Sequence, residues 1–366
     1  MSLTILILLC CYTAVTIFLI ISVLKKNRIP EQITEFPGVS VVVPFRNEQV
    51  NLPGLLQSLA AQDYQGPIEI ILIDDGSTDG SIEEIRKFDQ KLPVSPRVLH
   101  STFDPSVKLT SKQQALELGF QKASFEWIAL TDADVRLKPE WLTSLVLSAL
   151  PQKALIFGHT SLCIEQRCPL HLFQAFQLEF LFAVAYAFQM AGIPGSCMGN
   201  NLLVSRSAYL QAGGQKAIGY NIVEDMALLN LFYRKGNRVQ ASIPFSPTVI
   251  TFPEKRFPDF LNQAKRWALG GFSLSPILSL IGLLFSFQNA SFVLLLFTGL
   301  NPVHFSIAAV NFLLTWVLIA VAFRKTGSST HAVYFPLYYP FLLLESVILL
   351  ISIAARPSIK WKNRRI

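Results

Sequence analysis

Long apolar runs occur at both ends of the chain, at residues 2–24, 276–300, 303–323 and 333–355. A helix needs roughly 20 apolar residues to span the hydrocarbon core of a bilayer, so each run is long enough to cross a membrane. Residues 39–267, between the first two runs, mix polar and apolar positions and are numerous enough to bury a core of their own. The pattern predicts a globular domain attached to membrane segments on both sides.

Within the middle region, short β-branched runs alternate with stretches whose leucines fall at helical spacing. The strands are predicted at residues 39–43, 68–73, 97–100 and 127–131, and the helices include residues 49–61 and 111–123. The strands look apolar on both faces, which is typical of parallel strands covered by helices on each side. This alternation predicts an α/β sheet of Rossmann type, in which ligands bind beyond the carboxyl ends of the strands.

The charge pattern predicts the orientation of the membrane segments. No basic residue precedes the first apolar run and no small-residue cleavage pattern follows it, so we expect an uncleaved anchor and not a signal peptide. Lys25, Lys26 and Arg28 come directly after the run, and the positive-inside rule then places the middle domain in the cytosol. Five cysteines, an odd count, indicate no disulfide framework and agree with a reducing compartment. We expect a multi-pass protein of the cell (inner) membrane whose catalytic domain faces the cytosol.

The net charge of +7 could also indicate nucleic-acid binding. That class is disfavoured, because the middle domain has no basic stripe with interleaved aromatic residues. We therefore attribute the excess of basic residues to the orientation of the chain in the membrane, and we expect the membrane, but no nucleic acid, as a partner.

Five segments are predicted from these patterns. They are an anchor at residues 1–26, a linker at 27–38, a cytosolic domain at 39–256, an interfacial helix at 257–272, and a membrane region at 273–366 with two or three spans and a basic tail. Three spans after a cytosolic domain would put the basic tail outside, against the charge rule. Either one run is re-entrant or interfacial, or the rule fails here, and Pro336, Pro340 and Glu345 make residues 333–355 the suspect run.

Two of the predicted strands end in pairs of aspartates. Asp74 and Asp75 follow residues 68–73, and Asp132 and Asp134 follow residues 127–131. The adjacent acids Asp74 and Asp75 could accept hydrogen bonds from a base and a ribose. At Asp132 and Asp134, hard carboxylate oxygens suit a divalent cation that bridges phosphates, and residues i and i+2 point the same way where a strand ends. The alternative is that both are solvated turns, because aspartate, glycine and serine are ordinary turn formers.

Two further clusters could carry chemistry. Glu224 and Asp225 begin a predicted helix, where a base could open onto a site, although the helix dipole alone favours acids in a first turn. Gln263, Arg266 and Trp267 lie just before the second apolar run. Arginine can hold a diphosphate by paired hydrogen bonds, but a snorkelling arginine and an interfacial tryptophan would look the same.

Taken in order, these clusters resemble the family 2 glycosyltransferases, in particular membrane-bound members such as ceramide glucosyltransferases and the synthases of cellulose, hyaluronan and poly-N-acetylglucosamine. The resemblance covers about residues 39–271, and the matching segments are residues 41–48, 74–79, 132–134, 224–225 and 263–267. It implies a Rossmann-like glycosyltransferase A-type domain with a mostly parallel mixed sheet, with transmembrane helices at both ends.

The resemblance also implies how a nucleotide-sugar, with a UDP-sugar as the expected donor, is held. The residues implied on the donor side are Pro44, Arg46, Glu48, Asp74, Asp75, Lys112 and Asp132. Of these, Asp74 and Asp75 would contact the uracil or ribose, and Lys112 matches a basic position near the donor. Asp134 would bind Mg²⁺ or Mn²⁺.

The remaining implied roles concern transfer of a hexosyl or N-acetylhexosaminyl group with inversion. Asp225 would be the general base, while Glu224, Gln263, Arg266 and Trp267 would hold the diphosphate and the acceptor end. Asn200 and Asn201 fall where related synthases line the acceptor opening, but the residues differ from the usual ones, so the acceptor is expected only to be a lipid or a growing glycan.

Two other classes remain open. A membrane nucleotidyltransferase would also use paired acids and a metal, but it would not need the cluster of Gln263, Arg266 and Trp267. A non-enzymatic component of a polysaccharide export assembly could bind nucleotide or glycan, although acids at all of these positions argue against it. The few predicted spans favour a single transfer to lipid over formation of a polymer channel.

Overall fold

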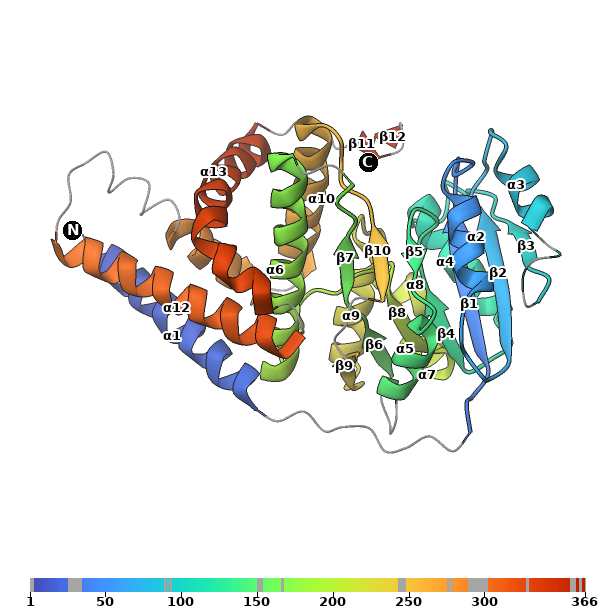
Figure 1. The fold of residues 1–366 in the computed structure, drawn as a ribbon, viewed down its shortest axis with the longest axis horizontal. Coiled ribbons are helices and arrows are strands. Elements are labelled where there is room, and N and C mark those ends of the chain that lie inside the picture. Colours follow the sequence, from blue (N-terminus) through green and yellow to red (C-terminus); the bar gives the residue numbers. More distant parts are fainter. Residues whose placement is uncertain are drawn as a thin grey trace. The chain divides into compact units, whose positions relative to one another are not determined.

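The computed structural model describes residues 3–25, 35–88, 90, 92, 94–149, 154–165, 168–242, 248–274, 277, 279–288, 302–326, 329–355, 360–361 and 364–365. Its contacts divide the chain into two units (Figure 1). The sheet unit comprises Arg28–Glu165 and Cys197–Pro253, and the helical unit comprises Met1–Asn27, Gln166–Ser196 and Glu254–Ile366. Lys26, Arg28, most of the expected linker and residues 289–300 of the second apolar run lie outside the described residues.

The sheet unit is built on a mixed, mostly parallel sheet of seven described strands in the order β3-β2-β1-β4-β8-β6-β9. The strands are β1 (Val39–Phe45), β2 (Ile68–Asp74), β3 (Arg97–His100), β4 (Trp127–Leu130), β6 (Leu155–Phe157), β8 (Leu202–Ser205) and β9 (Val239–Ala241). Only β8 runs antiparallel to its neighbours, β4 and β6. The predicted fold class is confirmed.

Strand β1 lies in the interior of this sheet, between β2 and β4, and every one of its seven residues is buried. It pairs in parallel with β2, from Val39 opposite Ile68 to Phe45 opposite Asp74, and with β4 on its other side. Its apolar residues on one face pack with α2 (Leu52–Ala60) and α5 (Trp141–Ala149) in one hydrophobic core. An apolar strand covered in this way does not face water, which explains the lack of polar alternation in its sequence.

Helix α4 (Ser111–Lys122) covers the opposite face of β1 and β2. The two elements approach closely at Gly119, where a Cβ atom would lie 2.6 Å from both Val42 Cγ1 and Ile73 Cδ1. Thr110 caps the helix with a capping box, in which its hydroxyl accepts from the Gln113 N–H and the Gln113 side chain accepts from the Thr110 N–H. The start of α4 is therefore fixed at the carboxyl edge of the sheet.

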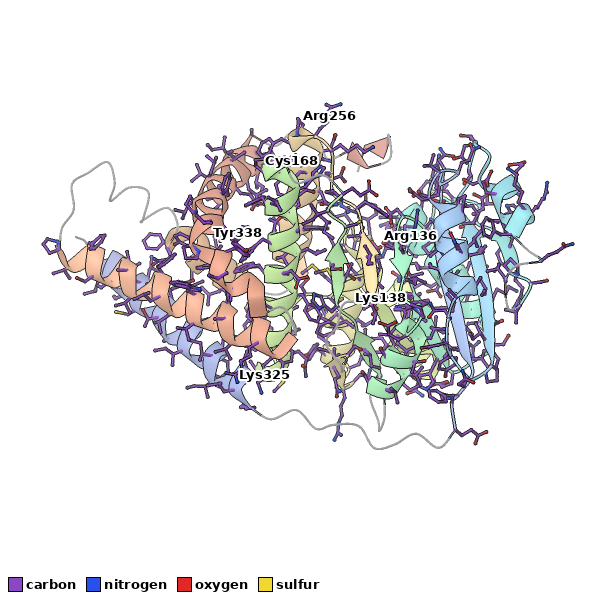
Figure 2. All side chains as sticks on the ribbon, in the orientation of Figure 1. Arg136, Lys138, Cys168, Arg256, Lys325 and Tyr338 are labelled. Carbon is purple, nitrogen blue, oxygen red and sulfur yellow. The ribbon has the colours of Figure 1, made fainter. Side chains whose placement is uncertain are left out.

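The sheet unit has four further described helices and a second sheet. Its helices are α3 (Ser81–Phe88), α7 (Arg206–Ala212), α8 (Gly214–Ile218) and α9 (Glu224–Arg234). A second sheet joins β5 (Arg136–Leu137), β10 (Val249–Thr251) and β7 (Thr160–Leu162). The guanidinium of Arg136, labelled in Figure 2, lies 5.3 Å from the centre of the Phe252 ring, so a cation–π contact fixes the turn that follows Asp134.

The described helices of the other unit are α1 (Leu3–Leu24), α6 (Pro169–Ala191), α10 (Phe257–Leu274), α12 (Pro302–Thr326), the 3₁₀ helix η2 (Ser329–Tyr334) and α13 (Phe335–Ala354), with a short helix at Ser279–Gln288. The last described residues form two short strands, β11 (Lys360–Trp361) and β12 (Arg364–Arg365). Among the described residues, four segments are long and apolar enough to cross a membrane, namely Leu6–Leu24, Pro169–Ala191, Phe305–Lys325 and Ala332–Ala354. Three of them coincide with predicted spans.

Helix α6 is the span that the sequence pattern does not reveal. Gln174, Gln177 and Glu179 interrupt its apolar residues, so it reads as part of a mixed-polarity region, yet all three side chains are buried. The helix contacts α1 and α12 and belongs to the helical unit, although the predicted boundaries include it in the cytosolic domain at residues 39–256. Aromatic rings add to this packing, since Tyr338 of α13 (Figure 2) lies 4.3 Å from the Phe176 ring, measured between centroids.

Several buried polar side chains of the helical unit bond to side chains on neighbouring helices. The Gln177 amide donates to Glu345 Oε1 at 2.6 Å, which gives the carboxyl group of α13 a partner on α6. The Thr13 hydroxyl of α1 donates to Asn311 Oδ1 at 2.6 Å, and the Tyr12 and Thr315 hydroxyls lie 2.7 Å apart. Such pairs let polar side chains occupy helices that otherwise suit lipid. Helix α13 is continuous through Pro340 and Glu345, the residues that made this run suspect.

Candidate functional site

The carboxyl ends of β1, β2 and β4 meet at one edge of the sheet because these strands are parallel. The Asp75 N–H donates to the Phe45 carbonyl at 2.9 Å, and Arg46 Nη1 donates to the Asp75 carbonyl at 3.0 Å. The segment after β1 and the segment after β2 are thus joined directly. This edge, at the point where the strand order reverses, is where open α/β sheets place their ligands.

Asp74 and Asp75 are held by hydrogen bonds and are buried, so they are not simple solvated turn residues. Asp74 Oδ1 accepts from the Ser77 N–H at 2.8 Å, and its Oδ2 lies 3.2 Å from Nδ1 of His100. The Ser111 hydroxyl at the start of α4 donates to the Asp75 carboxylate. His100 was missed by the sequence analysis, although a polar residue at the end of a third parallel strand was a usable signal.

Glu48 stabilises the loop around the site. Its carboxylate accepts from the Asn51 amide at 2.7 Å, and its N–H donates to the Ser81 hydroxyl at 2.9 Å. Asn47, with a φ of 52°, accepts from the Thr78 N–H at 2.7 Å and so joins the same two loops. These bonds fix the backbone between Arg46 and Ser81, and the expected place of Glu48 beside a nucleotide remains a prediction.

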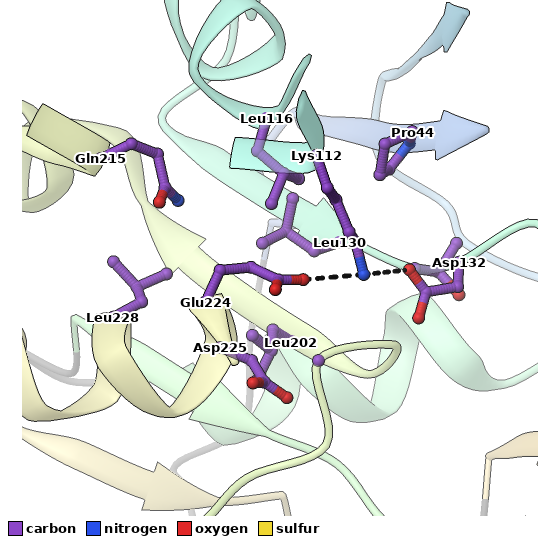
Figure 3. Close-up of a pocket in the computed structure, with 12 residues that line it drawn as sticks. Pro44, Lys112, Leu116, Leu130, Asp132, Leu202, Gln215, Glu224, Asp225 and Leu228 are labelled. Carbon is purple, nitrogen blue, oxygen red and sulfur yellow. Dashed lines mark ion pairs between the residues drawn. The ribbon is translucent and has the colours of Figure 1, made fainter. Parts of the chain in front are cut away.

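Lys112 connects two of the predicted acidic clusters. Its Nζ lies 2.9 Å from Asp132 Oδ1 and 2.8 Å from Glu224 Oε1, as the dashed lines in Figure 3 mark. Burial alone would lower the pKa of Lys112, but the charges of Asp132 and Glu224 outweigh it and raise the pKa above its ordinary value. The side chain therefore remains an ammonium ion between the two carboxylates.

A pocket surrounds this ammonium ion. With the solvent at its mouth it has a volume of about 330 Å³, and it is lined by Pro44, Lys112, Leu116, Leu130, Thr131, Asp132, Gly199, Leu202, Gln215, Glu224, Asp225 and Leu228. Five of the predicted site residues, Pro44, Lys112, Asp132, Glu224 and Asp225, thus share one pocket.

Asp225 stands in the first turn of α9 with its carboxylate at this pocket (Figure 3). The backbone of Gly199 passes so close that a Cβ atom there would lie 2.7 Å from Asp225 Oδ2 and 2.9 Å from Asp225 Cβ. Asn201, two residues on, is fully buried; its Oδ1 accepts from Trp141 Nε1 at 3.0 Å and its amide donates to the His159 carbonyl at 3.0 Å. A well-anchored segment therefore packs against the predicted base.

Cys197 begins that segment and is buried near the same acids. Burial raises the pKa of its thiol well above the ordinary value, and the negative charges of Asp225 and Glu224 raise it further. The group therefore stays a neutral thiol and adds no negative charge beside Asp225.

Asp134 is exposed in the turn between β4 and β5, two residues after Asp132. Within the part of the chain that the structure describes, no group of three or more histidine, cysteine or acidic residues could hold a metal ion alone. Mg²⁺, however, is usually bound by one or two carboxylates together with substrate phosphates. Asp132 and Asp134 fit such a cation if it arrives with a diphosphate.

Gln263, Arg266 and Trp267 all lie on α10 of the helical unit, a helix that begins at Phe257, where the interfacial helix is predicted to begin. Burial raises the pKa of Glu254 in this unit; the charge of Asp259 raises it further and that of Arg266 opposes the shift. Arg266 thus has an acidic neighbour of its own unit. Its expected place at the diphosphate remains a prediction.

Comparison with known proteins agrees with this geometry. The model of the family described as glycosyl transferase family 21 matches residues 2–366. An undecaprenyl-phosphate 4-deoxy-4-formamido-L-arabinose transferase of Aeromonas hydrophila is 34% identical over 123 residues, which are 32% of this chain and 35% of that protein. A dolichol-phosphate mannosyltransferase of Mycosarcoma maydis is 28% identical over 144 residues, 37% of this chain and 47% of that protein. The chain thus spans less than half the length of these two relatives.

A solved structure supports the fold over nearly the whole chain. The mannosyltransferase PcManGT from Pyrobaculum calidifontis, solved in complex with GDP-Man and Mn²⁺, superposes with a TM-score of 0.56 at 16% sequence identity. The similarity covers 96% of this chain and 98% of that one. At this level of identity it is the fold that the two proteins share.

Proposed function

The chain belongs to glycosyl transferase family 21, and from this premise we propose a membrane-bound, inverting transferase that moves a sugar from a UDP-sugar to a lipid or a growing glycan. The observation that carries the proposal is the pocket in which Lys112 lies between Asp132 and Glu224, with Asp225 beside them. It brings an acid suited to the donor and an acid suited to deprotonate an acceptor into one pocket.

The donor side of the proposed reaction uses the carboxyl edge of the sheet. Asp74 and Asp75, oriented by Ser77, His100 and Ser111, would hold the uracil and ribose. Pro44, Arg46 and Glu48 lie in or directly after β1 and would border the nucleotide. Asp132 and Asp134 would hold Mg²⁺ or Mn²⁺, and such an ion would supply Lewis-acid stabilisation of the departing diphosphate.

The acceptor side is assigned to Asp225. Its carboxylate takes the proton from an acceptor hydroxyl while that oxygen forms a bond to the anomeric carbon and the bond from this carbon to the diphosphate oxygen breaks. One displacement of this kind inverts the anomeric centre, so an α-linked donor gives a β-linked product. The positive charge of Lys112 reduces the repulsion that three neighbouring carboxylates would otherwise exert on one another.

The helical unit is proposed to hold the diphosphate and the acceptor. Arg266 can bind a phosphate through two parallel hydrogen bonds, and Gln263 and Trp267 lie on the same helix, α10. The proposed orientation places the sheet unit on the cytosolic side of the cell (inner) membrane, where nucleotide-sugars would reach it.

A donor screen tests the proposal. Membranes that contain the protein are incubated with UDP-glucose, UDP-galactose, UDP-N-acetylglucosamine and GDP-mannose, each with Mn²⁺, and lipids are extracted for labelled product. We expect one UDP-sugar to label a lipid or glycan and to release UDP, and membranes with the Asp225→Asn variant to give neither. Release of pyrophosphate would instead indicate a nucleotidyltransferase, and binding without turnover would indicate a non-enzymatic component.

A further inference from the structure

Thr131 has a buried hydroxyl that the described structure leaves without a hydrogen-bond partner. The residue follows β4 directly and precedes Asp132, and its side chain is almost fully buried, at 1% exposure. Its N–H donates to the Val42 carbonyl at 3.4 Å, but among the described residues its Oγ1 has no partner. A buried polar group without a partner costs free energy, so such a group in a native protein needs an explanation.

The position of Thr131 suggests one. It lines the same pocket as Lys112, Asp132, Glu224 and Asp225. The ammonium group of Lys112 is already bonded to Asp132 and Glu224. In this pocket Thr131 is an uncharged group whose capacity to donate one hydrogen bond and accept others is unused.

The proposed reaction determines what must occupy the pocket. The anomeric carbon has to lie between the diphosphate, on the side of Asp132, and the attacking oxygen, on the side of Asp225. The ring of the transferred sugar therefore fills the space between them. The apolar walls of the pocket, formed by Leu116, Leu130, Leu202 and Leu228, suit the C–H groups of such a ring.

We propose that the Thr131 hydroxyl forms a hydrogen bond with a hydroxyl group of the transferred sugar and thereby helps to select the donor sugar. This inference rests on the proposed function. A site that hydrogen-bonds a substrate hydroxyl discriminates strongly against an analogue without it, because the protein group is then left unpaired. The nucleotide, which is assigned to Asp74 and Asp75, does not depend on Thr131.

Two variants test the inference. Thr131→Val keeps the shape and removes the hydroxyl, and Thr131→Ser keeps the hydroxyl. For the UDP-sugar that gives product in the donor screen, we expect Thr131→Val to lower kcat/KM by about 10- to 100-fold and Thr131→Ser to retain most of it. The Kd of UDP with Mn²⁺ should change by less than about twofold. The unfolding temperature of donor-free Thr131→Val should be unchanged or higher, because no hydrogen bond is lost in that state.

Donors that lack one sugar hydroxyl identify the contact. For one ring position, removing the hydroxyl from the donor should lower the kcat/KM of the wild type as much as Thr131→Val lowers it with the full donor. With that deoxy donor, the Thr131→Val variant should show no further loss of kcat/KM. Unchanged kcat/KM in Thr131→Val, an equal loss of UDP affinity, or a lower unfolding temperature would each overturn the role of Thr131. Each of these results leaves the proposed function standing, whereas a wild type that turns over no nucleotide-sugar would remove both.

Discussion

One lysine lies among three carboxylates at the carboxyl edge of the sheet. Asp132, Glu224 and Asp225 share a pocket, and the ammonium group of Lys112 bonds to the first two. Without Lys112 these neighbouring carboxylates would repel one another and favour protonation. A base that has to be ionised to accept a proton depends on such a counter-charge nearby.

Removal of this charge should weaken both fold and function. We expect Lys112→Met to lower the free energy of unfolding by about 1–3 kcal/mol, between the values for surface pairs and for fully buried pairs. The two carboxylates outweigh the effect of burial and raise the pKa of Lys112. The contribution of Lys112 to the stability of the fold is therefore complete below the ordinary lysine pKa of 10.5 and declines only at more alkaline pH. The difference in free energy of unfolding between the wild type and Lys112→Met, measured by chemical denaturation, should therefore be constant from about pH 6 to about pH 9.

Lys112→Arg is the matched control, since it keeps the charge and should recover a large part of the stability and the UDP affinity. A Lys112→Met protein as stable as the wild type would show that the two ion pairs contribute nothing to folding.

Gly199 offers a second test at the residue scale, because it has no side chain where Asp225 needs space. A methyl group there would meet Asp225 Oδ2 at 2.7 Å. We expect Gly199→Ala to displace the carboxylate and lower kcat by roughly 10- to 100-fold, as misplaced catalytic groups do, while UDP binding with Mn²⁺ is retained. In an Asp225→Asn background the same change should cost almost nothing further in transfer. Equal losses in both backgrounds would mean that Gly199 does not act through Asp225.

The acids of this site could be predicted from sequence, whereas their supporting residues could not. Asp75 and Asp132 are recognisable because carboxylates directly follow buried strands. Gly199 and Thr131 acquire their significance only from the neighbours that folding brings to them, namely Asp225 and the pocket. Nothing in a one-dimensional pattern indicates that a particular hydroxyl will be left unpaired.

Among the elements, the four parallel strands β1 to β4 were predicted, whereas the later strands and the possible membrane span α6 were not. Strands β1 and β2 consist mostly of β-branched and aliphatic residues, which is typical of buried parallel strands. Helix α6 was hidden because Gln174, Gln177 and Glu179 look solvent-exposed in the sequence. They are tolerated because partners on other segments satisfy them; the Gln174 side chain, for example, bonds to both the N–H and the carbonyl of Glu254.

The contact between α6 and α13 gives a prediction for these helices. Gln177→Leu removes the amide that donates to Glu345 at 2.6 Å and leaves a buried carboxyl group without this partner. We expect a loss of about 1–2 kcal/mol in the free energy of unfolding in detergent. The double variant Gln177→Leu, Glu345→Leu should recover most of it, because an apolar pair needs no partner. A double variant less stable than the single one would contradict this account of the contact.

In the molecule as a whole, the proposed chemistry is divided between two units. The sheet unit carries Asp75, Asp132 and Asp225, and the helical unit carries Arg266 on α10 and four segments that could cross a membrane. Sequence order alone indicated both sets of residues, but not that α6, in the middle of the chain, belongs with the membrane helices.

The most direct test of the central claim compares donor binding with sugar transfer in the Asp225→Asn protein. Asparagine keeps an oxygen that can accept the Met226 N–H hydrogen bond, now 2.8 Å long, so the start of α9 should be preserved. The account predicts a Kd for UDP with Mn²⁺ within about twofold of the wild type and a transfer rate lower by about 10²- to 10⁴-fold, the usual contribution of a general base. Near-normal transfer in this variant would contradict the account.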